Sequence, residues 1–126
     1  MKSFIVSLII GITVIAGTVF YTHRIEVVSE KLSKDNKKLI EVLNDEDFEK
    51  ALELTNNMDD YVNEKKLSLA IIMDHTDLDK IEMGIAELKG YIEGEIKTDA
   101  LAKCNSLDVM LRHMPKNYKL KIENVL

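Results

Sequence analysis

The sequence predicts an all-α protein in which a single N-terminal transmembrane helix continues into a small antiparallel helical bundle that ends in an α-hairpin. Three observations predict it. Residues 3–22 form a run of twenty residues without a charge. Beyond this run, apolar residues recur every three or four positions among charged ones, which is the period of an amphipathic helix. The chain has no tryptophan and one proline, at Pro115.

The uncharged run has the length of a membrane span. At about 1.5 Å per residue, twenty helical residues extend ~30 Å, the hydrocarbon thickness of a bilayer. We therefore expect residues 1–22 to be a transmembrane anchor and residues 23–126 to be a helical bundle domain. A cleaved signal peptide is the alternative, but its apolar part is usually about 7 to 15 residues long and ends at a small-residue site. We favour a retained signal anchor.

The orientation of such an anchor is predicted differently by two criteria. Lys2 is the single basic residue before the run, and five follow closely: Arg24, Lys31, Lys34, Lys37 and Lys38. Counting Lys and Arg alone places the bundle in the cytoplasm. The two-residue segment before the run is instead typical of an uncleaved signal anchor, so we expect a single-pass protein of the cell membrane with an extracytoplasmic bundle.

The apolar stripe continues directly from the run and predicts two long helices. The first reaches about Asn44, and Asp35 and Asn36 interrupt its stripe as either a local weakness or a polar device that sets register. Asn44 is a plausible N-cap for the second helix, residues 45–75, which has acidic residues in its first turn. A helix of that length runs back along the first.

Two further helices complete the predicted bundle as a hairpin. A TDLD motif at Thr76 predicts the start of the third helix, and Thr98 predicts the start of the fourth, which ends just before Pro115. Cys104 lies on the apolar stripe of the fourth helix and is interpreted as a packed thiol. The tail after Pro115 alternates apolar and basic residues and is expected to lie extended, against the bundle or near the membrane surface.

Charge and motifs exclude several function classes. After the run the chain carries sixteen basic and twenty-two acidic residues, a balance of about −6 that argues against nucleic-acid binding. The chain has no GxSxG motif and no glycine-rich phosphate loop. We therefore predict that the protein is not an enzyme and has no cofactor.

A metal site is conceivable at one end of the predicted bundle. His75 and His113 are expected at that end, with Asp79 and the nearby carboxylates Asp74, Asp77 and Glu82, a donor set that suits Zn²⁺. The spacing matches no known ligand motif. Histidines at helix C-termini also interact well with the negative end of the helix dipole. We favour this capping role, and no residue is assigned to a metal.

The span itself offers a contact surface. Small and hydroxyl residues including Ser7 and Gly11 fall near one face of the helix, where another membrane helix could approach closely. The leading hypothesis is a non-enzymatic interaction or accessory module for another membrane protein. The bilayer is its second partner, and a homo-oligomer is possible. The alternative is a metal- or small-ligand-binding sensor domain that uses the end with His75 and His113.

The second half of the chain resembles a bacterial family of small membrane-anchored proteins, domain of unknown function 4363. The resemblance is carried by Asp74 and His75, Ile81 and Glu82, Tyr91 and Ile92, His113 to Pro115, and Glu123 to Leu126. It implies one span followed by charged helices, and it implies no established activity. The chain departs from the family pattern because it lacks a tryptophan in the second helix.

Overall fold

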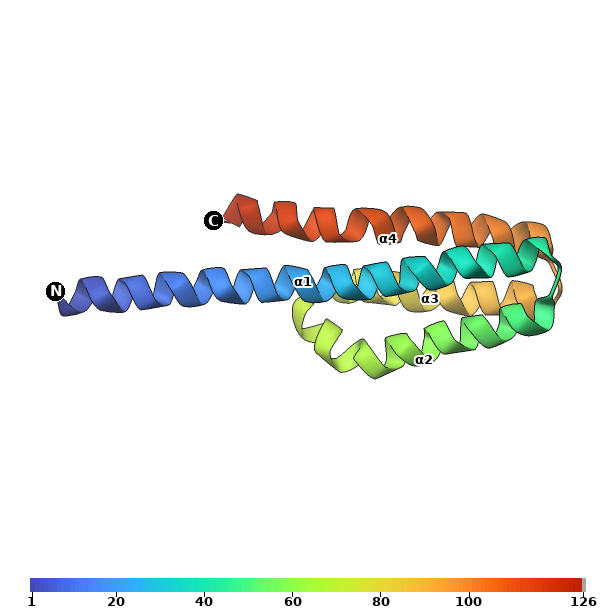
Figure 1. Ribbon diagram of the computed structural model, residues 1–126, viewed down its shortest axis with the longest axis horizontal. Helices are drawn as coiled ribbons and strands as arrows, with labels where there is room; N and C mark the ends of the chain where they lie inside the picture. Colours follow the sequence, from blue (N-terminus) through green and yellow to red (C-terminus); the bar gives the residue numbers. More distant parts are fainter. Residues whose placement is uncertain (126) are drawn as a thin grey trace.

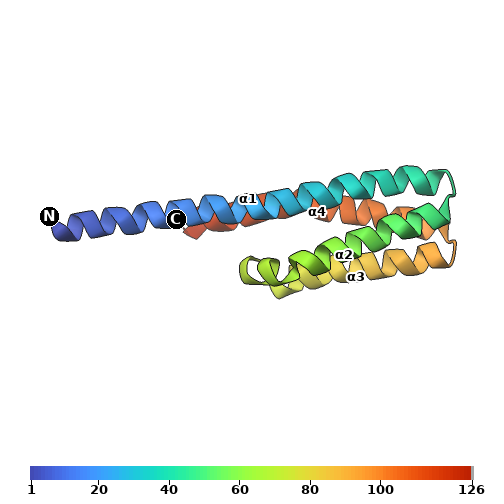
Figure 2. The ribbon, with the colours of Figure 1, turned by 60° about the horizontal axis from the view of Figure 1, so that its bottom comes forward.

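The computed structural model describes residues 1–125, and these form four helices: α1 (Lys2–Asn44), α2 (Phe48–Ile72), α3 (His75–Glu93) and α4 (Lys97–Val125). Successive helices run in opposite directions (Figure 1). Both α1 and α3 pack along α2 and α4, so the four helices lie at the corners of a bundle (Figure 2). The predicted fold class is confirmed.

Helix α1 has two unlike halves. Residues 1–17 are all exposed, and this part projects beyond the bundle (Figure 1). From Ile25 onwards the helix buries one face against its neighbours. The first half is long and apolar enough to cross a membrane, and none of its apolar stretch is buried. It is therefore compatible with a single-pass anchor and does not serve as a core helix of this bundle.

The bundle core consists of the apolar stripes that the sequence predicts. Each helix contributes side chains with 3 % exposure or less: Leu32, Leu39 and Leu43 from α1, Met58, Val62 and Leu69 from α2, Ile81, Ile85 and Leu88 from α3, and Cys104, Leu107 and Leu111 from α4. Burial of one stripe per helix is what makes helices of this length stable in a small domain.

The two loops far from the N-terminus share one conformation. Glu46 and Glu95 both have positive φ, 57° and 56°. The amide after each donates to a carbonyl five residues earlier: Asp47 to Val42 at 3.2 Å, and Ile96 to Tyr91 at 2.8 Å. This is the Schellman motif, in which glycine usually occupies the left-handed residue.

The loop geometry corrects four predicted helix boundaries. Asn44 is the last residue of α1, and Asp47 caps α2 by accepting the Lys50 amide at 3.1 Å. Helix α2 ends at Ile72, and α3 begins at His75, so Thr76 is inside α3 and does not cap it. Thr98 likewise lies in the first turn of α4. Acidic residues that the prediction placed in the first turn of the second helix, such as Glu46, belong in the structure to a Schellman turn.

The predicted end of the fourth helix is wrong. Pro115 lies inside α4, which continues to Val125, so the tail is helical and not extended. A proline within a helix costs about 3 kcal/mol because it lacks an N–H and its ring clashes with the preceding turn. Tyr118, 4 % exposed, continues the buried stripe of Leu111 and Met114. Burial of this side chain offsets the proline.

Gly84 marks a close approach of α3 to α4. A Cβ built there would lie 2.8 Å from Leu107 Cδ2, whereas one at Gly90 on the same helix would meet nothing within 4 Å. We expect Gly84→Val to lower the free energy of unfolding by about 1–3 kcal/mol through overpacking. Gly90→Val should stay within about 0.5 kcal/mol of the wild type. Urea unfolding followed by circular dichroism compares the two, and equal effects would contradict the close contact.

Candidate functional site

The core contains one wholly buried amide. Asn36 has an exposed fraction of 0 %, and its Nδ2 donates to the Cys104 carbonyl at 2.8 Å, which joins α1 to α4. Its Oδ1 has no hydrogen-bond partner among the described residues. A polar group that is satisfied in only one alignment of two helices specifies their register. Of the two interpretations of this break in the stripe, the structure favours the register device.

The structure does not bring together the residues of the metal site that the sequence analysis considered and did not favour. His75, His113 and Asp79 are all exposed. Within residues 1–125, no group of three His, Cys, Asp or Glu side chains comes close enough to hold a metal ion. The capping interpretation is also wrong in detail, because His75 begins α3 and His113 lies inside α4. Neither imidazole therefore lies at the negative end of a helix dipole.

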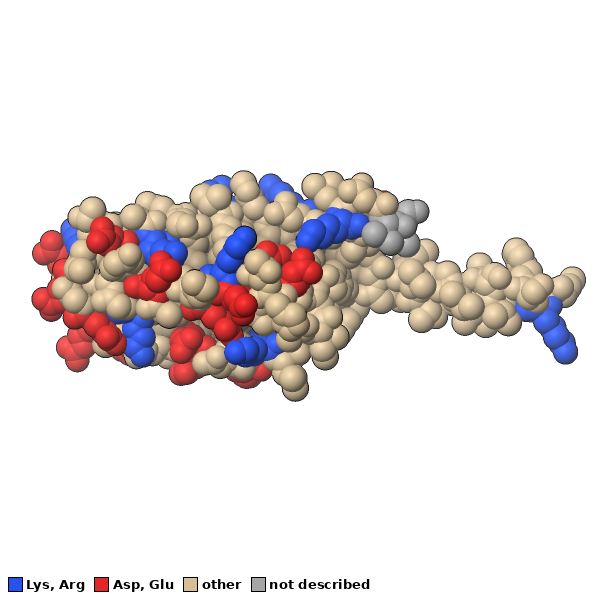
Figure 3. All heavy atoms as spheres, turned by 180° about the vertical axis from the view of Figure 1, so that it is seen from behind, with Lys and Arg blue, Asp and Glu red and all other residues tan. Residues whose placement is uncertain are grey.

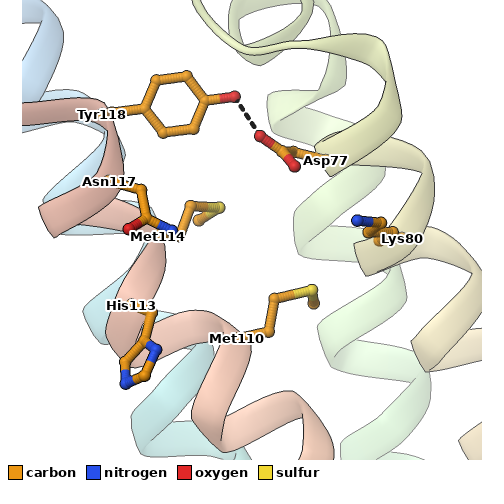
Figure 4. A pocket seen from close by; sticks show the side chains of 7 residues that line it. All are labelled: Asp77, Lys80, Met110, His113, Met114, Asn117 and Tyr118. Atoms are coloured by element: carbon orange, nitrogen blue, oxygen red, sulfur yellow. Dashed lines mark hydrogen bonds between the residues drawn. The ribbon is translucent and has the colours of Figure 1, made fainter. Parts of the chain in front are cut away.

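A hollow of about 220 Å³ lies between α3 and α4 (Figure 4). It is near the end from which α1 projects, because Tyr118 in its lining packs against Tyr21 of α1. Its lining residues are Asp77, Lys80, Met110, His113, Met114, Asn117 and Tyr118. Asp77 points toward Tyr118, while His113 turns its ring away from both (Figure 4). Small-molecule sites usually have roughly 300 to 1,000 Å³. The hollow is therefore small for an organic ligand.

Tyr118 is the centre of a polar network at this end of the bundle. Its hydroxyl donates to Asp77 Oδ2 at 2.6 Å and accepts the Asp74 amide at 2.9 Å. Lys121 Nζ donates to Asp74 Oδ2 at 3.0 Å and lies 5.0 Å from the centroid of the Tyr118 ring. Burial, followed by the hydrogen bond to Asp77, raises the pKa of Tyr118 above its usual value. These contacts join α4 to the α2–α3 junction.

The same end of the bundle is linked to α1 at residues 20–24, just after the exposed half of this helix. The rings of Tyr21 and Tyr118 lie 6.2 Å apart, centroid to centroid, at an interplanar angle of 59°. Arg24 Nη2 donates to Ser68 Oγ of α2 at 3.0 Å, and its guanidinium lies 5.9 Å from the centroid of the Phe20 ring. Side chains from both α2 and α4 thus hold α1 at the point where its apolar half enters the bundle.

Charge is distributed unevenly along the bundle. Figure 3 shows acidic side chains gathered at the end far from the projecting helix, whereas basic side chains are scattered along the visible face. The acidic residues of the two far loops and their flanks are Asp45, Glu46, Asp47, Glu93 and Glu95. The basic residues of the last part of α4 are Arg112, Lys116, Lys119 and Lys121. The two ends therefore present different chemistry.

A protein-family model described as Domain of unknown function (DUF4363) matches residues 19–125. The chain belongs to this family. The DUF4363 match begins in the last four residues of the uncharged run and extends through the whole bundle to the end of α4. It therefore includes the Tyr118 network. Comparison with curated proteins and with solved structures gave no match.

The two residues predicted to contact another membrane helix lie in the exposed half of α1. Ser7 and Gly11 are one turn apart, and both are exposed. A Cβ added to Gly11 would meet nothing within 4 Å. This face is therefore not used by the bundle itself.

Proposed function

We propose that this protein is a single-pass membrane protein whose bundle, outside the cytoplasm, is a non-enzymatic interaction module for another membrane protein. One observation carries the proposal: α1 passes without a break from its exposed apolar half into the bundle core. A continuous helix transmits the orientation of the span to the bundle. A partner in the same membrane would then meet the bundle in one defined orientation.

The contacts between α1 and the bundle next to the predicted span support the same function. Arg24 and Tyr21 hold α1 against α2 and α4 at the point where the exposed half of α1 meets the bundle. A flexible tether would need none of these contacts, because its two parts would move independently. The arrangement suits a module that positions a partner, and the Ser7 and Gly11 face is where a partner span could approach closely.

A sensor for a small ligand is the second candidate. The observation that favours it is the hollow between α3 and α4, which Asp77, Lys80 and His113 line with ionisable groups. Its volume of about 220 Å³ suits an ion or a very small molecule. Titration calorimetry of the full-length protein in detergent with Zn²⁺ tests this candidate. Binding that His113→Ala abolishes supports it, and the absence of heat rejects zinc as the ligand.

The interaction function is tested by affinity purification of the tagged full-length protein from native membranes in mild detergent. We expect a membrane-protein partner in stoichiometric amount. Gly11→Leu should remove it, because a large side chain there prevents close approach of a second span. Ile12→Leu, a conservative change on the neighbouring position, is the matched control and should retain the partner.

A chimera separates the span from the bundle. It carries an unrelated transmembrane helix in place of residues 1–22 and keeps the bundle unchanged. Loss of the partner from the chimera assigns recognition to the span, and retention assigns it to the bundle. Recovery of the wild-type protein alone, with no partner in stoichiometric amount, would contradict the interaction function.

A further inference from the structure

The last turns of α4 lie beside the apolar half of α1. A shallow groove there is lined by Val14, Gly17, Thr18, Tyr21 and Ile122. Four of these five residues belong to the uncharged run, so α4 extends past the end of the bundle along the predicted span (Figure 1). The described part of α4 beyond Tyr118 is residues 119–125, which at ~1.5 Å per residue extends roughly 10 Å.

Large apolar side chains are exposed at the same level. Leu67 and Ile71, one turn apart on α2, are each 81 % exposed, and Leu120 on α4 is 56 % exposed. Their level is given by two contacts with α1: Ser68 of α2 bonds Arg24, and Tyr118 of α4 packs against Tyr21. The bundle therefore exposes these side chains close to the boundary of the uncharged run.

The charges on this part of α4 suit the surface of a membrane. Residues 112–125 contain four basic residues and one acidic residue, Glu123, although the chain as a whole is acidic. Lysines near the end of an apolar segment extend their charged groups toward the headgroups, and anionic lipids attract them. Aromatic side chains are enriched at the same depth, and Phe20, Tyr21 and Tyr118 gather here.

We propose that the end of α4 and the Leu67–Ile71 turn of α2 are embedded in the headgroup and outer acyl region of the bilayer that α1 spans. The inference rests on the proposed membrane anchor. The bilayer is the occupant because the apolar surface is continuous with the span and is bordered by lysines. The ~10 Å reach of α4 past Tyr118 is comparable with the roughly 5–10 Å depth at which interfacial helices bury their apolar faces.

Embedding these segments would have a mechanical consequence. A single helix can tilt and rotate in a bilayer, and its tilt is set by packing and by interfacial anchors. Three contacts with the membrane, at α1, at α4 and at the end of α2, define a plane. The bundle would then stand at a fixed angle on the membrane, with its acidic end directed away from the surface.

The test places an environment-sensitive fluorophore on single introduced thiols of the full-length protein. The protein is reconstituted into vesicles of phosphatidylcholine with a minor share of phosphatidylglycerol. The labelled variants are Leu120→Cys and Ile71→Cys at the proposed contact, Val6→Cys in the span, and Val109→Cys at an exposed site of α4 within the bundle. Cys104 is retained, because it is buried and burial raises the pKa of its thiol to about 12.

Two quenchers then report on the surroundings of each label. We expect nitroxide-bearing lipids to remove most of the emission at Leu120→Cys and Ile71→Cys, and aqueous iodide to quench Val109→Cys. Iodide quenching of both contact sites, with lipid quenching of Val6→Cys, would overturn the bilayer contact and leave the anchor intact. Protection of Leu120→Cys from both quenchers would also overturn it, because protein would then cover the site. Iodide quenching of Val6→Cys would reject the membrane anchor itself.

Discussion

Replacing Asn36 with aspartate is expected to lower the free energy of unfolding of the bundle by about 3–5 kcal/mol, the usual cost of leaving a buried charge uncompensated. The side chain has an exposed fraction of 0 %. In the wild type, Asn36 Nδ2 lies 2.8 Å from the Cys104 carbonyl oxygen, to which it donates. The change replaces this donor with a carboxylate oxygen that faces the same carbonyl. Two acceptors would then face each other in the core without a proton between them.

The measurement is urea unfolding of the full-length protein in mild detergent, followed by circular dichroism. Asn57→Asp makes the same chemical change on an exposed position of α2 and should stay within about 0.5 kcal/mol of the wild type. The deficit of Asn36→Asp should shrink in acid, because a protonated carboxyl regains a donor. Equal stabilities of the two variants at neutral pH would show that Asn36 is not held in the core.

Helical periodicity predicted most of the fold, because a strong stripe leaves few alternatives. On α3 the apolar residues that recur at helical spacing are all 2 % exposed or less: Leu78, Ile81, Ile85, Leu88 and Ile92. Four stripes of this kind, joined by short loops, can bury their apolar faces only by packing side by side. The order of the helices and their antiparallel packing follow from the same argument.

The predictions that failed depended on local rules that tertiary packing overrides. Asn44 and Thr98 are good capping residues, but each loop forms a Schellman turn with a glutamate in the left-handed position, a choice that composition does not indicate. Pro115 usually ends a helix. Here Met114 and Tyr118, on either side of Pro115, are both buried, and their burial stabilises the continuation of α4.

That one error concealed the candidate site. With the tail predicted as extended, Tyr118 was not assigned to the buried stripe of the fourth helix, although it follows Met114 and Leu111 at helical spacing. Its partners Asp74 and Asp77 are more than forty residues away in the sequence. No local pattern reports such a contact. Histidine is a versatile ligand and was therefore the residue type that the sequence indicated, whereas the polar network in the structure is centred on a tyrosine.

Removing the Tyr118 side chain is expected to lower the free energy of unfolding by as much as Asn36→Asp does. Tyr118→Ala deletes a ring that is 4 % exposed and leaves a cavity among α1, α3 and α4, for which aromatic-to-alanine changes typically cost about 3–5 kcal/mol. It also removes the donor to Asp77 and the acceptor for the Asp74 amide. Urea unfolding of the full-length protein in detergent measures the sum of these losses.

Tyr118→Phe separates the hydroxyl from the ring. This variant keeps the packing and should cost only about 1–3 kcal/mol, the penalty of leaving buried polar groups unpaired. The loss in free energy of unfolding caused by Tyr118→Phe should also depend on pH. The pKa of Tyr118 is raised above the usual 10.0 in the folded protein, so above pH 10 the unfolded chain loses the phenol proton first. The stabilisation by the hydroxyl is therefore complete below pH 10 and decreases as the pH rises further.

The difference in the free energy of unfolding between wild type and Tyr118→Phe should accordingly be constant below pH 10 and narrow as the pH rises above 10. Hydrogen exchange locates the effect: amides of residues 116–125 should exchange faster in Tyr118→Ala, while those around Ile85, at the centre of α3, should change only with global stability. A uniform increase along the whole chain would show that Tyr118 acts as an ordinary core residue. A local increase confined to the end of α4 would mean that one phenol holds the last turns of this helix against the base of the span.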